Sequence, residues 1–286
     1  MASCMAAVVP DSLAASVDVL EAIGISSVVL SPIDYCCGYP QSNEGSVRGF
    51  LERNLALAHD ASRYKVKQLV IGCSTCYEVY HTWLHKNNIV EYPFEVIGTV
   101  QLVANHIDTL KSKFEKRIDK VVTVQDCCHI GRCSGEYDAQ RKILQAIPGV
   151  KMVEMKHHKE RAICCGWMDL IFDDRGWLQR RTIFEEAKAA GADAIMTIAH
   201  LCNRTLSPLE DEYGIEVINY NNLLGMALGY EYDKKCHRYL KMNPDEVIKA
   251  AQREIEASPF GREATEAMAK EYIARWGSWH IRNKRT

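Results

Sequence analysis

Hydrophobic and polar positions follow two alternating patterns along most of the chain. Short apolar runs rich in β-branched residues predict strands at 26–30, 68–72, 121–124 and 194–198. Stretches with helical spacing, roughly 12 to 18 residues long, separate these runs. Strands that alternate with helices predict parallel βα units and therefore an α/β fold.

The chain also contains an internal duplication. The sequence Cys-Cys-Gly occurs at 36–38 and again at 164–166, an offset of 128. Offsets of 124 upstream and 126 downstream align two more cysteine pairs, Cys4 with Cys128 and Cys76 with Cys202. Each half thus has the order cysteine, helix, strand, cysteine pair, helix, strand, cysteine. This order predicts cysteines at the carboxyl edge of a parallel sheet, where α/β proteins build their sites.

The duplication defines the expected domains. We expect two pseudo-symmetric domains at 1–115 and 116–230, each with a short parallel sheet flanked by helices. Polar helical patterns predict a helical C-terminal extension at 231–286. The extension ends in a basic, aromatic tail, for which we expect partner docking or solvation rather than membrane contact.

Composition and charge exclude several classes of partner. Of the 286 residues, 47% are hydrophobic and 25% charged, as in globular proteins with a sizeable core. The formal net charge of −2 gives no global field to attract nucleic acid. No apolar run is long enough to span a bilayer, and the first residues do not resemble a signal peptide. We therefore expect a cytoplasmic protein.

The twelve cysteines are the feature in which the composition departs from average. In a compartment where thiols stay reduced, they favour metal ligation or redox chemistry over disulfides. The first half carries Cys4, Cys36-Cys37 and Cys73-x-x-Cys76. Five cysteines exceed what a structural zinc needs, and adjacent cysteines suit a multi-iron centre. A c-type haem would need histidine directly after Cys76, and a thioredoxin-like pair would explain only two of the five.

The pattern Cys…Cys-Cys-Gly…Cys-x-x-Cys, present twice, resembles the CCG-domain family and in particular the B subunit of heterodisulfide reductase. Supporting stretches lie at 53–58, 128–132, 217–220 and 223–229, and the resemblance covers about residues 1–240. It implies a noncubane iron–sulfur centre that faces a cavity in which a disulfide is split homolytically. It also implies that electrons arrive from a flavin-bearing subunit through the clusters of a ferredoxin-like iron–sulfur subunit.

The resemblance implies two ligand sets, Cys4, Cys36, Cys37, Cys73 and Cys76 for the first centre and Cys128, Cys164, Cys165 and Cys202 for the second. The second set is one short, because Ala199 stands where the family pattern has a cysteine. Three explanations stay open: a conventional four-thiolate cubane, completion by Cys127, Cys133 or His200, or loss of the cluster. A four-cysteine zinc site is a further alternative.

Other residues near the motifs have two interpretations each. Cys127 is either a spare thiol or a supplementary ligand, while we interpret Cys133 and Cys236 as structural or solvent-facing thiols. His129 and Arg132 follow Cys128, where they could donate hydrogen bonds to a cluster or a substrate, or serve as a cap or ion pair.

We expect the chain to be an oxidoreductase acting on sulfur groups, the iron–sulfur catalytic subunit of a heterodisulfide reductase-like complex. It would reduce or form a small-molecule or protein-bound disulfide at a noncubane [4Fe-4S] centre in the first half, with a second iron–sulfur cluster of altered type in the second half. The alternatives are an electron-relay subunit for aromatic-ring reduction or succinate oxidation, and a non-catalytic scaffold stapled by zinc.

Overall fold

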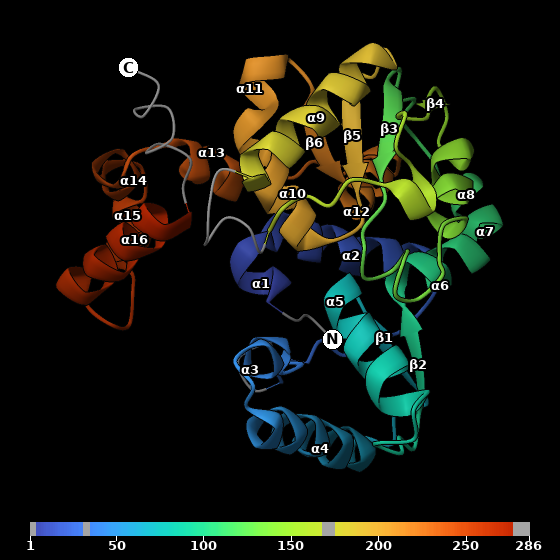
Figure 1. The fold of residues 1–286 in the computed structure, drawn as a ribbon, viewed down its shortest axis with the longest axis vertical. Coiled ribbons are helices and arrows are strands. Elements are labelled where there is room, and N and C mark those ends of the chain that lie inside the picture. The colour runs from blue at the N-terminus through green and yellow to red at the C-terminus, as the bar shows by residue number, and fades with distance from the viewer. Residues whose placement is uncertain (1–3, 31–34, 168–174, 277–286) are drawn as a thin grey trace. The chain divides into compact units, whose positions relative to one another are not determined.

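Short parallel sheets flanked by helices form most of the chain, as the alternating pattern predicted (Figure 1). The structure is a computed structural model that describes residues 4–30, 35–167 and 175–276. The chain divides between Tyr232 and Asp233 into two compact units. A further division of the first unit at 115/116 stays a prediction, and the basic tail beyond residue 276 lies outside the described residues.

The second half contains a four-stranded parallel sheet in the order β4-β3-β5-β6 (Figure 1). Its strands are β3 (Val121–Gln125), β4 (Lys151–Val153), β5 (Ala194–Thr197) and β6 (Glu216–Asn219). All four residues of β5 are buried, as expected for a parallel strand that is covered on both faces. The accompanying helices are α8 (Ala139–Ala146), a 3₁₀ turn (Lys159–Arg161), α9 (Arg175–Ala189), α10 (His200–Leu206), a 3₁₀ turn (Ser207–Leu209), α11 (Glu210–Tyr213) and α12 (Tyr220–Ala227).

The first half has a smaller sheet, in which β1 (Gln68–Ile71) pairs with β2 (Glu95–Gly98) in parallel. Its helices are α1 (Met5–Val8), α2 (Pro10–Ala22), α3 (Tyr39–Asn43), α4 (Val47–Arg63), α5 (Ser74–Tyr77), a π-helix (Glu78–His85), α6 (Thr99–Asn105) and α7 (Ile107–Lys111). The predicted strand at 26–30 was wrong, because this segment pairs with no described strand. Without a neighbour to cover them, Val28 is 79% exposed and Val29 is 50% exposed.

The two halves share one hydrophobic core and are joined by helix packing. Helix α2 of the first half lies against α12 of the second. Ser12 donates a hydrogen bond of 2.5 Å to the side-chain oxygen of Asn222, whose amide donates to Asp11 at 3.1 Å. The shared core and this helix packing place both halves within one compact unit.

The second unit is helical, as predicted. It contains α13 (Lys235–Lys241), α14 (Pro244–Ala250), α15 (Gln252–Glu256) and α16 (Arg262–Trp276). Asn243 and Glu246 form a reciprocal capping box at the start of α14, which satisfies two backbone amides. None of the described helices in either unit is long and apolar enough to cross a membrane.

Candidate functional site

Four of the five cysteines expected to serve the first half form a string of hydrogen-bonded thiols. The order along the string is Cys36, Cys37, Cys76 and Cys73. Cys36 is partly exposed, whereas the other three are buried. The loop before α3 and the turn after β1 thus bring together thiols that are about forty positions apart in the sequence.

The fifth cysteine, Cys4, lies beside this string and is linked to it by a histidine of the second half. The Cys4 Sγ is 3.2 Å from Nε2 of His200, which also hydrogen-bonds Cys73. His200 is fully buried, whereas Cys4 is exposed. We considered His200 as a residue that could complete the second site, but the structure places it at the first.

The second half brings five thiols together, one more than the sequence predicted. They form a closed ring in the order Cys127, Cys128, Cys164, Cys165 and Cys202, with each thiol hydrogen-bonded to the next and Cys202 to Cys127. Of the two interpretations of Cys127, a spare thiol away from the site does not fit this geometry. Cys133 lies beside Glu78 and Cys236 is in the second unit, so neither belongs to either group.

The glycine of each Cys-Cys-Gly turn adopts a conformation that other residues rarely reach. Gly38 has φ of +75° and Gly166 has φ of +69°. A Cβ atom on Gly38 would also lie 3.0 Å from the ring of Phe50, and one on Gly166 would lie 2.8 Å from Cα of Gly176. Both turns therefore need glycine for their backbone conformation and for the close approach of a helix, α4 in the first half and α9 in the second.

A buried side chain from α4 or α9 holds each turn. Asn54 of α4 donates to the carbonyl oxygen of Cys37 at 3.1 Å. Arg180 of α9 donates to the carbonyl oxygens of Cys165 and Gly166, each at 3.1 Å. Asn54 lies 17 positions after Cys37 and Arg180 lies 15 positions after Cys165, so the two halves support the turn from different positions of the repeat.

A pair of repeat-related residues connects the two groups. Ser74 and His200 are 126 positions apart, and each begins the short helix that follows a central strand. The Ser74 hydroxyl lies 3.2 Å from Sγ of Cys127, while His200 contacts Cys4. Each half thus contributes one side chain that contacts a thiol of the other half, so the two groups of thiols are adjacent.

Hydrogen bonds between the thiols separate their pKa values within each group. Hydrogen bonds from Cys36 and Cys76 hold the pKa of Cys37 well below its usual value, while the bond to Cys37 raises that of Cys76. In the second group, hydrogen bonds from Cys128 and Cys202 lower the pKa of Cys127. The arrangement favours the thiolate, the form of cysteine that binds metal, at Cys37 and Cys127, and the protonated thiol at Cys76.

Two histidines, the buried His200 and the partly buried His129, carry positive charge toward these thiolates. Burial lowers the pKa of His200, but the charge of Cys73 and the hydrogen bond to Cys4 outweigh it and raise the pKa to about 10. Burial likewise opposes the protonated form of His129, whose hydrogen bond to Glu78 nevertheless raises its pKa to about 9. Both rings are therefore hydrogen-bond donors beside negatively charged sulfur.

The two candidate neighbours His129 and Arg132 contact protein groups around the sites. His129 pairs with Glu78 of the π-helix, and its ring meets that of Tyr39 edge-on at 5.3 Å. Arg132 donates to the carbonyl oxygen of Ala162 at 2.6 Å, two residues before the second cysteine pair. In this structure both residues therefore position the loops that carry the thiols.

The donor set fits an iron–sulfur centre, because such clusters are held by cysteine thiolates and each half gathers five. Among the described residues, no three histidine, cysteine, aspartate or glutamate side chains have an arrangement that would hold a single metal ion. Sequence reasoning missed the roles of Asn54, Arg180 and Ser74, and it considered His200 only for the second site. Applying the downstream offset of 126 to the buried polar residues would have paired Ser74 with His200.

Comparison with known proteins agrees with this geometry. The D subunit of dihydromethanophenazine:CoB–CoM heterodisulfide reductase from Methanosarcina mazei is 31% identical over 226 residues, which are 76% of this chain and 55% of the relative. The B subunit of fumarate reductase (CoM/CoB) from Methanothermobacter marburgensis is 26% identical over 67% of this chain and 38% of its own length. EtfAB:quinone oxidoreductase from Syntrophomonas wolfei is 28% identical over 60% of this chain and 23% of its own length.

The chain spans about half the length of the heterodisulfide reductase subunits that it matches. The family model described as a cysteine-rich domain, CCG, matches twice, at residues 2–79 and 122–207. These two matches contain the two groups of thiols and cover more than half of the chain. The chain belongs to the cysteine-rich CCG domain family.

Proposed function

We propose that the chain is the iron–sulfur catalytic subunit of a heterodisulfide reductase-like complex and converts a disulfide to two thiols, or the reverse. The observation that carries this proposal is the pair of adjoining five-cysteine groups, in each of which four thiols come from matching positions of the repeat. The likeness to a heterodisulfide reductase subunit over three quarters of the chain supports it.

Each half would hold one iron–sulfur centre. Cys4, Cys36, Cys37, Cys73 and Cys76 would hold a noncubane [4Fe-4S] centre, and Cys128, Cys164, Cys165 and Cys202 would hold a second cluster. The second cluster would be of altered type, because a cysteine is missing at Ala199 and Cys127 would supply the fifth thiol from another position. When bound, such a centre supplies one-electron steps and a metal site for sulfur.

The residues of this chain would hold, orient and shield these centres. Buried Cys37, Cys73 and Cys76 form the inner side of the first group, and the exposed Cys4 and partly exposed Cys36 form its outer side. A disulfide from solvent would therefore approach the first group past Cys4. Reduction of this disulfide takes two electrons and two protons and releases two thiols. Because an iron–sulfur centre supplies electrons in one-electron steps, the two electrons would be delivered one after the other.

The electrons would come from other subunits. We propose a ferredoxin-like iron–sulfur subunit and a flavin-bearing subunit as partners in the same complex. The second centre would pass electrons to the first, because Ser74 and His200 bring the two groups into contact. We also propose a cytoplasmic location, since all twelve cysteines are free and free thiols are maintained in reducing compartments.

The test is single turnover by the anaerobically reconstituted chain. The photoreduced protein is mixed with CoB–CoM heterodisulfide, the substrate in the name of the relative, and the released thiols are counted. We expect thiol release by the unchanged chain and by Cys236→Ser, whose cysteine lies outside both groups, and none by Cys37→Ser. A reconstituted, photoreduced chain that consumes no disulfide would contradict the proposal.

A second candidate is an electron relay without disulfide chemistry, for aromatic-ring reduction or succinate oxidation. The likeness to EtfAB:quinone oxidoreductase and to a fumarate reductase subunit favours it. In the same experiment a relay would retain its iron and reduce an artificial one-electron acceptor, but release no thiols. A zinc-stapled scaffold, the remaining alternative, would bind zinc and transfer no electrons.

A further inference from the structure

A tyrosine of the π-helix is buried behind the first group of thiols without a hydrogen-bond partner. Tyr80 comes four residues after Cys76, so the two side chains leave the helix about one turn apart and on the same side. Tyr80 is fully buried, and its hydroxyl forms no hydrogen bond with any residue that the structure describes. Buried hydroxyls in native proteins have a partner, because an unpaired one is costly. The Tyr80 hydroxyl therefore indicates an acceptor that the polypeptide itself does not supply.

The thiols of the first group act on this hydroxyl. Burial is the main cause that raises the pKa of Tyr80, and the charges of Cys76 and Cys37 raise it further. Both cysteines are members of the first group, so the phenol oxygen lies on the side of the ring that faces this group. The raised pKa also keeps the proton on the phenol. Tyr80 is therefore a hydrogen-bond donor toward negatively charged sulfur.

The aromatic neighbours of Tyr80 do not satisfy its hydroxyl. The ring of Tyr92 meets that of Tyr80 edge-on at 6.1 Å and stacks on Phe94 at 5.3 Å. The hydroxyl of Tyr92 is likewise buried and has no partner among the described residues, so the two hydroxyls do not bond to each other. Burial alone raises the pKa of Tyr92, without a contribution from a cysteine. Of the two phenols, only Tyr80 thus responds to the first group.

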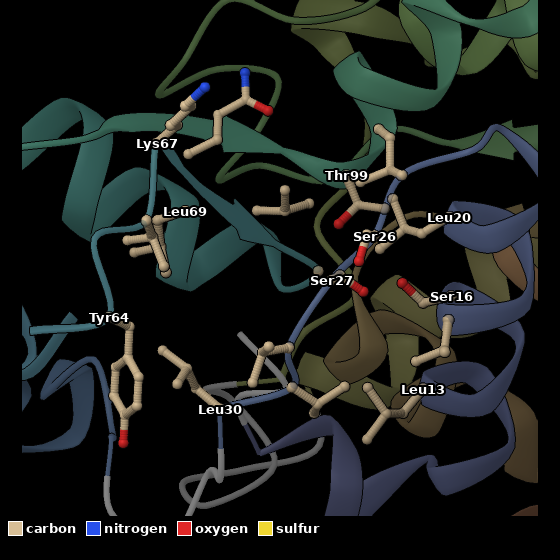
Figure 2. Close-up of a pocket in the computed structure, with 18 of the residues that line it drawn as sticks. Leu13, Ser16, Leu20, Ser26, Ser27, Leu30, Tyr64, Lys67, Leu69 and Thr99 are labelled. Atoms are coloured by element: carbon tan, nitrogen blue, oxygen red, sulfur yellow. The ribbon is translucent and has the colours of Figure 1, made fainter. Parts of the chain in front are cut away.

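The cavity beside β1 does not offer water to this hydroxyl. It has a volume of about 460 Å³ and is lined by β1, by residues 25–30 and by one side of α2. Figure 2 shows Leu69 on one side of this cavity and Leu13 and Leu20 on the opposite side. Tyr80 is not among the described residues that line it. A partner for the hydroxyl would therefore come from the first group and not from this cavity.

The repeat places an apolar residue at the matching position of the second half. The offset of 126 that aligns Cys76 with Cys202 also aligns Tyr80 with Leu206. Leu206 is fully buried, as Tyr80 is, so the two positions share their burial and differ in the hydroxyl. The two halves would therefore surround their centres differently at this position.

We propose that the Tyr80 hydroxyl donates a hydrogen bond to a sulfur atom of the iron–sulfur centre of the first half and so raises its reduction potential. A donor to sulfur stabilises the reduced form, which is the more negative one, more than the oxidised form. Leu206 gives no such bond, so Tyr80 favours electron transfer from the second half to the first. The inference rests on the iron–sulfur centre of the proposed function, but not on its disulfide chemistry.

The test is a redox titration of the reconstituted full chain, followed by electron paramagnetic resonance. Cys165→Ser serves as the background, so that only the first centre forms. We expect Tyr80→Phe to bind as much iron as this background, but to have a roughly tenfold lower equilibrium constant for one-electron reduction, which is a potential about 59 mV lower. The matched control is Tyr92→Phe, which removes the other buried, unpartnered hydroxyl and should leave the potential unchanged.

Two further measurements separate this role from a structural one. In the iron-free chain, Tyr80→Phe should not lower the midpoint of urea denaturation, because the hydroxyl has no partner to lose. In the Cys37→Ser background, where only the second centre forms, Tyr80→Phe should leave the potential unchanged. An equal shift in both backgrounds, or a loss of iron-free stability with an unchanged potential, would overturn the inference.

Failure of the inference and failure of the proposed function give different results. If Tyr80→Phe binds iron fully and its first centre keeps the potential of the background, the inference is wrong while the centre itself stands. If the unchanged chain takes up no iron, both the proposed function and the inference are wrong.

Discussion

Single residues determine how each Cys-Cys-Gly turn presents its thiols. The glycine permits a left-handed backbone, and the buried Asn54 or Arg180 holds the carbonyl group of the second cysteine. The same task is done by an amide in one half and by a guanidinium in the other. The turn geometry, rather than the residue that supports it, is what the two halves share.

Gly38→Ala should impair the first centre. We expect a loss of about 1–2 kcal/mol from the left-handed backbone, with a further loss because the new methyl group meets Phe50 and Asn54. The matched control is Gly45→Ala, since Gly45 has φ of +78° but nothing within 4 Å of its Cβ position. Chemical denaturation and iron content measure both effects. Equal stability and iron content in the two variants would contradict this account of the turn.

A buried ion pair supports the turn before Cys127. Arg141 donates to both carboxylate oxygens of Asp126 at 2.9 Å, and their side chains are 8% and 1% exposed. Arg141→Met should destabilise the protein by about 3–5 kcal/mol, because it leaves a buried charge without its partner. The exposed pair of Arg117 and Asp119 gives the control, and Arg117→Met should change stability by less than about 1 kcal/mol. Similar losses for both variants in urea denaturation would refute the assignment.

At the level of elements, the sequence predicts correctly the strands whose hydrophobic pattern is complete within a single segment of the chain. The runs at 68–72, 121–124 and 194–198 coincide to within one residue with β1, β3 and β5, because each is a largely apolar stretch between helical patterns. The run at 26–30 has a similar composition but forms no strand, because pairing depends on a neighbouring strand and not on composition alone.

The sequence predicts the members of the two ligand groups only for the cysteines that match between the two repeats. The matched cysteines do gather, since parallel strands end at a common edge. Cys127 joins the second group through Cys128 and Cys202 of its own half, whereas the addition of His200 to the first group depends on how the two halves pack together. No local pattern contains that information, although the positions of Ser74 and His200 in the repeat give a signal in retrospect.

The short helices α5 and α10 carry the contacts between the halves, and His200→Ala tests this directly. We expect it to lower iron affinity of the first centre by roughly 10–100-fold, as loss of a residue that orients a ligand does. The change is made in Cys165→Ser, where the first centre alone can form, and in Cys37→Ser, where only the second can. Iron titration should show the loss in the first background and not in the second. The opposite pattern would place His200 at the second centre.

At the scale of the whole molecule, the duplication gives two sites within one core. Helices α2 and α12 pack across the halves, and each half supplies one contact to the thiols of the other. Neither site is therefore built by its own half alone. As proposed, two adjoining centres, one of them beside the exposed Cys4, would provide both an entry point for electrons and a place for substrate.

The central claim is that each half holds its own iron–sulfur centre. The most direct measurement is the iron and acid-labile sulfide bound per chain after anaerobic reconstitution of the unchanged protein, Cys37→Ser, Cys165→Ser, the double variant and Cys236→Ser. The account predicts partial loss of iron in each single variant, complete loss in the double variant and no loss in Cys236→Ser. Full iron content in Cys37→Ser, or zinc in place of iron in the unchanged protein, would contradict it.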